Sequence, residues 1–272
     1  NTFFQVFAKV VSVVGGITLT YVLGQRFGEE GFGVYTFVMS FVLFFGNLSD
    51  WGTPFITIRE ASKVEPSQRR KIFSTALVVR LFLGIVSVLL VNTLIRVNPS
   101  WSVFITPVSV ASLVLVFLSL KTSFSVIFQT NLRFGRAAIV EIVSTLLFVG
   151  LSVFLVLGGG GVNHVISSWV LGTAVSVVVG YFLVSKHISP LSFNKSAATK
   201  LLKEAFPTGA LLIVSTVYNR ADILILQYFH DTRDVGIYGM AYKVYDTAVF
   251  GASYLMNAMF PLISGLYSAG QI

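Results

Sequence analysis

Asn219, Arg220 and Asp222 place an amide, a guanidinium and a carboxylate within four positions, inside a segment that is otherwise apolar. The segment, residues 205–229, has the length of a membrane-spanning helix. Charged side chains at bilayer depth are costly, so they occur where helices enclose a protein interior or a water-filled cavity. This grouping favours a helix bundle with a polar cavity, and transport is the first functional hypothesis.

Other predicted spans also carry polar and ionisable residues. At about 100° per residue, Lys9 lies on the same side of its helix as Ser12 and Gly16. We interpret the intramembrane charges as functional, whereas the small residues Ser168, Gly172, Ser176 and Gly180 are interpreted as helix-packing residues. The candidate substrate-binding residues are Lys9, Asn47, Asp50, Arg80, Asn219, Arg220, Asp222, Tyr242, Lys243 and Asp246.

The composition predicts a membrane protein of the all-α class. Of 272 residues, 55% are hydrophobic and 11% are charged, against roughly 25% charged residues in soluble domains. Apolar runs long enough to cross a bilayer predict a polytopic transmembrane bundle of eight helices. These runs fall at about 3–24, 34–58, 72–95, 101–126, 138–157, 162–185, 205–229 and 235–262.

The basic residues of the connectors predict the orientation, because cytoplasmic connectors are enriched in lysine and arginine. The odd-numbered connectors contain only Arg26, Arg96 and Arg233. The even-numbered connectors contain eleven basic residues, namely Arg59, Lys63, Arg69, Arg70, Lys71, Arg133, Arg136, Lys186, Lys195, Lys200 and Lys203. We therefore expect the even connectors and the N-terminus on the cytoplasmic side of the cytoplasmic membrane.

Several function classes are not supported by the sequence. The net charge of +8 comes largely from connectors between apolar spans, so nucleic acid is not an expected partner. Cysteine is absent, the three histidines have no metal-ligand spacing, and no nucleophile lies beside a base. Gly158–Gly161 forms a short turn between spans rather than a phosphate-binding loop. We predict no enzyme activity, no cofactor and no metal site.

The domain organisation follows from the longest connector and a weak internal repeat. The connector, residues 186–204, comes after the sixth predicted span. Gly33-Val34-Tyr35 opens the second span after a predicted external turn, and Gly236-Ile237-Tyr238 opens the eighth, 203 residues later. We predict a six-helix lobe at 1–185, a cytoplasmic connector at 186–204, and the first two helices of a second lobe at 205–272. The chain, which lacks an initial methionine, is interpreted as a fragment.

Two stretches resemble polysaccharide-biosynthesis flippases, the O-antigen-type lipid-linked oligosaccharide transporters of the multidrug/oligosaccharidyl-lipid/polysaccharide exporter superfamily. One stretch runs from Asn219-Arg220-Ala221-Asp222 to Ala241-Tyr242-Lys243, with Pro261 ending the last span. The other includes Leu48-Ser49-Asp50-Trp51-Gly52. The resemblance implies two six-helix lobes around a cavity that opens alternately to either side, with the second lobe truncated here.

The resemblance also implies the substrate, an isoprenoid-phosphate- or pyrophosphate-linked glycan drawn from the lipid bilayer. A cationic cavity suits a phosphate, and arginine offers bidentate contacts. From this we expect Arg80 or Arg220 to hold the phosphate, while Asp222 or Asp246 sets the local field or couples transport to a cation.

Two alternatives stay open. A cation-coupled multidrug antiporter of the same fold would bind cationic amphiphiles in an acidic cavity. The intramembrane charges favour an anionic substrate only slightly, with Lys9, Arg80, Arg220 and Lys243 against Asp50, Asp222 and Asp246. A structural or assembly membrane protein would instead pair all of these charges and leave no cavity.

Overall fold

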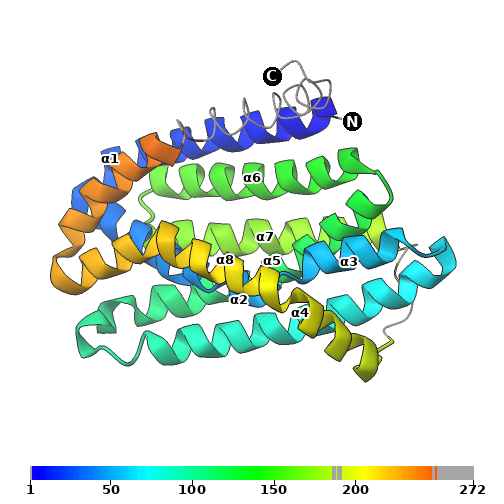
Figure 1. Ribbon diagram of the computed structural model, residues 1–272. Helices are drawn as coiled ribbons and strands as arrows, with labels where there is room; N and C mark the ends of the chain where they lie inside the picture. Colours follow the sequence, from blue (N-terminus) through cyan, green and yellow to red (C-terminus); the bar gives the residue numbers. More distant parts are fainter. Residues whose placement is uncertain (1, 186–187, 189–191, 247–248, 250–272) are drawn as a thin grey trace, which may run out of the picture.

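The computed structural model describes residues 2–185, 188, 192–246 and 249, and the described part is a bundle of long helices (Figure 1). Its elements are α1 (Thr2–Phe44), α2 (Gly46–Asp50), α3 (Thr53–Ser62), α4 (Pro66–Leu94), the 3-10 helix η1 (Pro99–Phe104), α5 (Ile105–Thr130), α6 (Phe134–Leu157), α7 (Val162–Val184) and α8 (Lys195–Phe229). Residues 232–246 are also helical. The all-α prediction is confirmed.

Six segments of the described chain are long and apolar enough to cross a membrane, and the first of them, Phe4–Ser62, contains 59 residues. A straight helix of that length would measure about 90 Å, three times the thickness of the hydrocarbon core. Instead the chain reverses direction at Gly28, where φ is 63° and ψ is −165°. This segment therefore accounts for the first two predicted spans, and the chain is a multi-pass membrane protein.

The predicted turn between these spans was wrong in its extent. We expected a connector at residues 25–33, but helix continues on both sides of Gly28, which is the one residue of α1 with non-helical dihedral angles. Glycine adopts a positive φ without the steric penalty of other residues. A single glycine therefore replaces the expected loop.

The second predicted span, 34–58, was expected to be continuous and is broken. Phe45 separates α1 from α2, and α2 ends before Trp51 and Gly52, both in the left-handed region with φ of 46° and 67°. Pro54 then lies in the first turn of α3, where its missing amide hydrogen costs nothing. We call Trp51 and Gly52 the helix break.

The core of the first helices lies where α1, α4, α5 and α7 meet, around Phe37, Val108, Leu115 and Trp169. On α7 the packing interpretation of the small residues is confirmed. Ser168 and Ser176 are buried, and a methyl group at Gly172 would lie 2.9 Å from the amide nitrogen of Phe148 on α6. Small residues at these positions let the helices approach closely.

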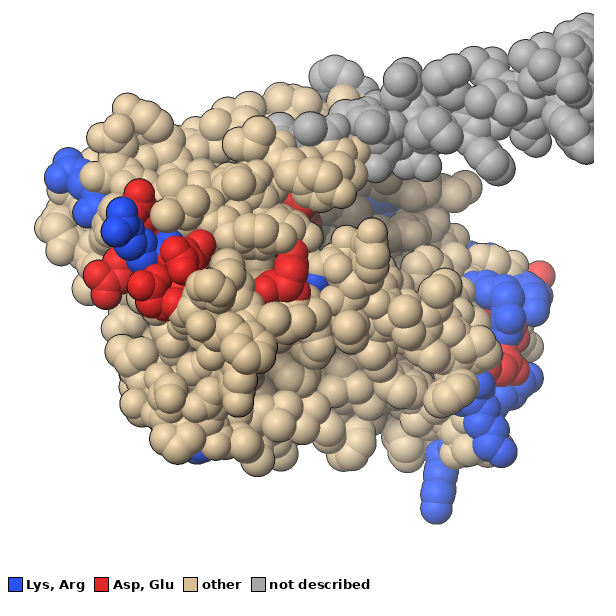
Figure 2. All heavy atoms as spheres, turned by 60° about the vertical axis from the view of Figure 1, so that its left-hand side comes forward, with Lys and Arg blue, Asp and Glu red and all other residues tan. Residues whose placement is uncertain are grey.

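The two ends of the bundle differ in which charged residues they expose (Figure 2). One end, which we call the basic end, carries Arg59, Lys63, Arg70, Lys71 and Lys195 among its exposed residues. The other, the kink end, carries Glu29, Asp231, Arg233 and Asp234 around Gly28. The predicted connector 186–204 is partly helical, because α8 begins at Lys195 with its first turn capped by the Asn194 side chain.

Candidate functional site

At the kink end, α1 residues 29–44 and helix 232–246 meet at two glycines. A methyl group at Gly33 would lie 1.8 Å from the carbonyl oxygen of Thr232. A methyl group at Gly236 would lie 1.9 Å from the carbonyl oxygen of Glu29. Any side chain at either position would force the helices apart, so only glycine permits this backbone contact. We call it the glycine crossing.

Exposed charges surround the glycine crossing. Arg233 Nε donates to Glu29 Oε2 at 2.5 Å, which joins the two crossing helices, and His230 Nδ1 lies 3.1 Å from Asp234 Oδ2. This hydrogen bond to the Glu29 carboxylate raises the pKa of Arg233. Because these side chains are exposed, the pairs contribute little to stability.

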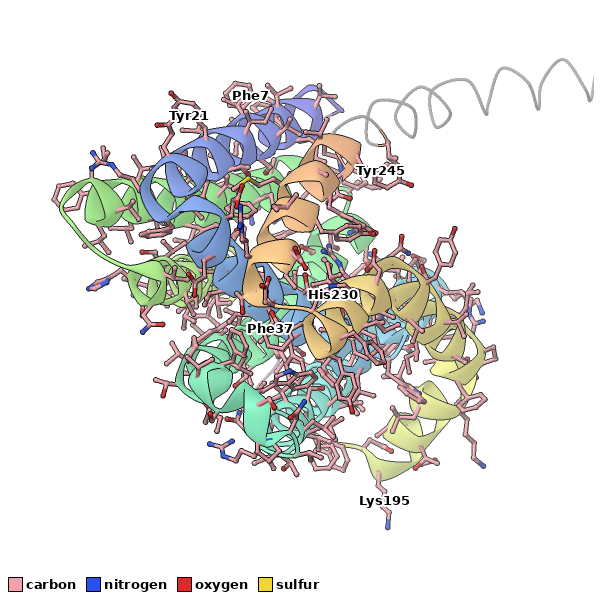
Figure 3. The ribbon with its side chains drawn as sticks, turned by 90° about the vertical axis from the view of Figure 1, so that its left-hand side faces the viewer. Phe7, Tyr21, Phe37, Lys195, His230 and Tyr245 are labelled. Atoms are coloured by element: carbon pink, nitrogen blue, oxygen red, sulfur yellow. The ribbon has the colours of Figure 1, made fainter. Side chains whose placement is uncertain are left out.

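A cavity of about 800 Å³ lies on the basic-end side of the glycine crossing. Its walls are the first half of α1 and helix 232–246, which Figure 3 shows from the kink end, with Tyr21 on α1 and Tyr245 on the side of helix 232–246 that faces away from α1. The lining residues are Lys9, Ser12, Val13, Gly16, Ile17, Thr20, Tyr21, Met240, Lys243, Val244 and Asp246. The predicted Lys9–Ser12–Gly16 seam therefore faces a cavity.

A small pocket of about 50 Å³ adjoins this cavity, and we call it the alcove. Lys243 and Asp246 line both spaces, so the alcove lies directly beside the cavity. The alcove is lined from one side by Arg220, Ile223, Gly239, Tyr242, Lys243 and Asp246, and from α1 by Tyr35, Thr36, Met39, Ser40 and Leu43. Five predicted site residues, Lys9, Arg220, Tyr242, Lys243 and Asp246, thus line these two adjacent spaces.

Asp222 lies elsewhere. Its carboxylate accepts hydrogen bonds from the Tyr238 hydroxyl at 2.7 Å and from the amide of Ile223 at 2.8 Å. It lines a separate open pocket of about 420 Å³ with Phe229 and His230. The helical angle between positions 220 and 222 already separated the two charges, because each residue turns the helix by about 100°.

Asn219 stays close to its own helix. Its side-chain amide donates to the backbone carbonyl oxygen of Ser215 at 2.6 Å. Its backbone carbonyl oxygen accepts a 3.0 Å hydrogen bond from the Tyr242 hydroxyl. Asn219 lines neither the cavity nor the alcove. It joins α8 to helix 232–246 instead.

Asp50 and Arg80 pair with each other. Arg80 on α4 is 1% exposed, and its Nη2 donates to Asp50 Oδ1 at the end of α2. The carbonyl oxygen of Arg80 accepts a 2.8 Å hydrogen bond from Ser119 on α5. Neither charged residue lines the cavity or the alcove. A buried cation needs a partner, and Asp50 supplies it directly before the helix break.

Asn47 belongs to a seam between α2 and α8. Its side-chain amide donates to Thr216 Oγ1 at 2.5 Å. Further along the seam, a methyl group at Gly52 would lie 2.7 Å from the amide nitrogen of Gly209. Gly209 follows Pro207, a proline inside α8. The break in one helix thus packs against the proline-containing turn of the other, and we call this contact the α2–α8 seam.

The sequence did not identify the uncharged wall of the alcove. Thr36, Met39 and Ser40 lie in an apolar stretch with no charge or motif to mark them. The one available signal was the 203-residue repeat, which pairs Ser40 with Lys243 and Met39 with Tyr242. Applied along the whole helix, the repeat would have located this wall.

Three solved transporters share the fold. A MATE multidrug transporter, DinF-BH, solved in complex with a ligand, matches with a TM-score of 0.70 and 18% identity over 96% of this chain and 63% of its own. A MOP superfamily transporter from Pyrococcus furiosus, whose binding pocket is described as having reverse polarity, matches with a TM-score of 0.53, 16% identity and coverage of 93% and 62%. An outward-facing MATE family multidrug resistance transporter matches with a TM-score of 0.55 and the same identity and coverage.

The chain spans slightly less than two thirds of the length of these transporters. No curated protein matches it. The family described as "Polysaccharide biosynthesis protein" matches residues 1–267, nearly the whole chain. The chain is therefore a member of the polysaccharide biosynthesis protein family, with the fold of the MOP superfamily transporters.

Proposed function

We propose that the chain belongs to a flippase that moves lipid-linked oligosaccharide or polysaccharide precursors across the cytoplasmic membrane by alternating access. The observation that carries this proposal is the combined charge of the described residues that line the cavity and the adjacent alcove. Three cations, Lys9, Arg220 and Lys243, line these two spaces together with one carboxylate, Asp246. The sequence alone counted four cations against three anions, and two of those anions, Asp50 and Asp222, bind elsewhere.

The size and the charged lining of the cavity suit the polar head of a lipid-linked glycan. A volume of about 800 Å³ is within the range of pockets that hold small-molecule ligands. A phosphate or pyrophosphate group would be attracted to the lysines and to the planar guanidinium of Arg220. The isoprenoid tail would stay in the bilayer while the polar head crosses within the cavity.

The proposed orientation places the basic end in the cytoplasm, by the distribution of lysine and arginine. The glycine crossing would then close the outer side of the cavity. In this proposal 1–185 forms the first lobe, 186–204 the cytoplasmic connector, and 205–272 the start of the second lobe. The part of the eighth predicted span beyond residue 249, with Pro261, lies outside the described residues.

A cation-coupled multidrug antiporter is the second candidate, because two of the similar structures are multidrug transporters. Asp246 is the cavity carboxylate that would bind a cationic drug or a coupling cation. A purely structural role has less support, since it requires the charges to pair without leaving a cavity.

Binding measurements on the full-length protein separate these candidates. Polyprenyl-phosphate glycans and cationic dyes would be titrated into the purified protein in parallel. The flippase proposal expects saturable binding of the glycan that weakens with Lys243→Ser. Saturable binding of the dyes without binding of the glycan would favour the antiporter.

A further inference from the structure

The glycine crossing establishes which positions correspond between two helix pairs. The first pair is the two halves of α1 on either side of Gly28, and the second pair is α8 with helix 232–246. The contact of Gly33 with Thr232 becomes the contact of Gly236 with Glu29 when each first-pair position is exchanged for the position 203 residues later. A third contact joins two corresponding positions directly, because a methyl group at Gly239 would lie 2.5 Å from the side chain of Thr36. This contact therefore lies on the two-fold axis that relates the two helix pairs. The two pairs therefore meet reciprocally.

Corresponding positions around the cavity and the alcove differ in charge. Ile17 corresponds to Arg220, Ser40 to Lys243 and Leu43 to Asp246, and all six residues line one of the two spaces. In each correspondence the charged residue belongs to the second helix pair. At these positions the charge is therefore one-sided, although the backbones meet reciprocally. Lys9 on α1 also lines the cavity, but its counterpart, Leu212, lines neither space.

The opposing wall of α1 is small and uncharged toward its middle. A methyl group at Gly16 would contact nothing within 4 Å, so packing does not require glycine there. Ser12 Oγ lies 3.1 Å from Thr145 Oγ1, and Thr20 donates to the carbonyl oxygen of Gly16 at 2.9 Å. Hydroxyl oxygens placed in this way retain acceptor capacity for the hydroxyl groups of a bound molecule.

We propose that the site binds its substrate asymmetrically: the phosphate group is held by Arg220 and Lys243 on the second helix pair, and the sugar lies along the Ser12–Gly16–Thr20 wall of α1. This inference rests on the proposed function, because it assumes a phosphate-linked glycan. Asp246 offsets one of the two cations when the phosphate is absent, which lowers the cost of keeping like charges together.

The alternative to a fixed phosphate site is a cavity in which only the total charge matters. Moving a cation from the second helix pair to the corresponding position of the first distinguishes a fixed phosphate site from a requirement for total charge. Ile17 lines the cavity and is 55% exposed, so an arginine fits there. Ser40 is 2% exposed and does not offer the same room. The two variants to compare are therefore Arg220→Ile alone and Arg220→Ile combined with Ile17→Arg.

The experiment measures flipping of a polyprenyl-diphosphate-linked oligosaccharide by the full-length protein in proteoliposomes. Loss of a charge-assisted phosphate contact lowers the rate about tenfold in Arg220→Ile, and adding Ile17→Arg leaves the rate low. The rate falls by a similar factor in Lys243→Ser, at an exposed position that tolerates serine. Lys195→Ser, at the start of α8 and outside the cavity, retains the wild-type rate.

Recovery of most of the activity in the Ile17→Arg, Arg220→Ile variant would overturn the inference and leave only a requirement for total charge. Wild-type activity in both Arg220→Ile and Lys243→Ser would also overturn it. If the wild-type protein moves a cationic dye and not the glycan, the proposed function itself fails. Elution in detergent as a single size-exclusion peak checks that each variant folds.

Discussion

The glycine crossing and the α2–α8 seam are both contacts between the first helices and the last two, but they are built differently. The crossing is a direct backbone contact with an exposed ion pair at its edge. The seam has the Asn47–Thr216 hydrogen bond across it and the Arg80–Asp50 pair behind it. Separating the crossing would break the exposed Arg233–Glu29 pair, whereas separating the seam would break the partly buried Asn47–Thr216 hydrogen bond. We infer that the crossing opens during transport and that the seam stays closed.

The largest expected effect comes from preventing closure at the crossing. Gly33→Leu or Gly236→Leu places a side chain where even a methyl group would overlap a carbonyl oxygen. We expect transport to be lost and the cavity to become accessible from the kink end. The chain contains no cysteine, so a cysteine introduced at Thr20 in the cavity and labelled with a membrane-impermeant maleimide reports this accessibility directly.

Gly150→Leu is the matched control for these substitutions, because Gly150 is exposed and a methyl group there would meet nothing within 4 Å. Wild-type transport is expected for it. If Gly33→Leu also retained transport and the original labelling pattern, the crossing would not be the contact that closes the cavity.

The second prediction concerns the Arg80–Asp50 pair. Asp50→Ala leaves the buried Arg80 guanidinium without its carboxylate, and breaking a buried pair in this way costs about 3 kcal/mol. We expect a clearly lower unfolding temperature in detergent. Because the two residues act together, the Arg80→Met, Asp50→Ala double variant loses less stability than the sum of the single losses. Additive losses would contradict the pairing.

This prediction changes the role that the sequence suggested for Arg80. A cation at bilayer depth was expected to bind phosphate, and Arg80 was one of the two candidates, with Arg220. In the structure Arg80 contacts Asp50 and lines neither the cavity nor the alcove. We now expect Arg80→Lys to lower stability and Arg220→Lys to lower transport, which complementation of a flippase-deficient strain would separate when membrane abundance is measured in parallel.

A smaller effect is expected at the hydrogen bond across the seam. Thr216→Val removes the nearer of the two acceptors of the Asn47 amide, leaving the Leu212 carbonyl oxygen at 3.4 Å, and costs about 1 kcal/mol. The unfolding temperature falls slightly, and transport changes little because the seam stays closed. A large loss of transport with unchanged stability would mean that the seam, and not the crossing alone, takes part in opening.

The smallest effect is expected at the exposed ion pair beside the crossing. Arg233→Gln and Glu29→Gln each remove one partner of a pair that solvent screens. We expect transport to change less than about twofold, and the change to disappear at high salt. A large and salt-resistant loss would assign the closing force to this pair and not to the glycines.

Much of the fold could be predicted from the sequence, because apolar runs of about 20 residues have few alternatives to membrane-spanning helices. The boundaries at Gly28 and at the helix break could not be predicted. Both depend on residues with positive φ, Gly28 at the first boundary and Trp51 and Gly52 at the second, and Trp51 has no intrinsic preference for such a conformation. The tertiary contacts of Asp50 and Gly52 hold that conformation.

The site could be predicted in part for a similar reason. Intramembrane charge identified Lys9, Arg220, Lys243 and Asp246, but charge alone did not distinguish a cavity residue from a paired one. Arg80 was assigned to the cavity on that basis and lies in a buried pair instead. Partners on other helices decide between the two roles, and those partners are distant in the sequence.

The most direct test of the account measures what the full-length protein moves across a bilayer. Proteoliposomes would be loaded with either a fluorescent polyprenyl-diphosphate-linked oligosaccharide or a cationic dye, and the rate of crossing would be followed for both. We predict that the oligosaccharide crosses the bilayer, that Lys243→Ser slows its crossing, and that the dye does not cross. Movement of the dye alone, at a rate that Lys243→Ser does not change, would contradict the flippase proposal.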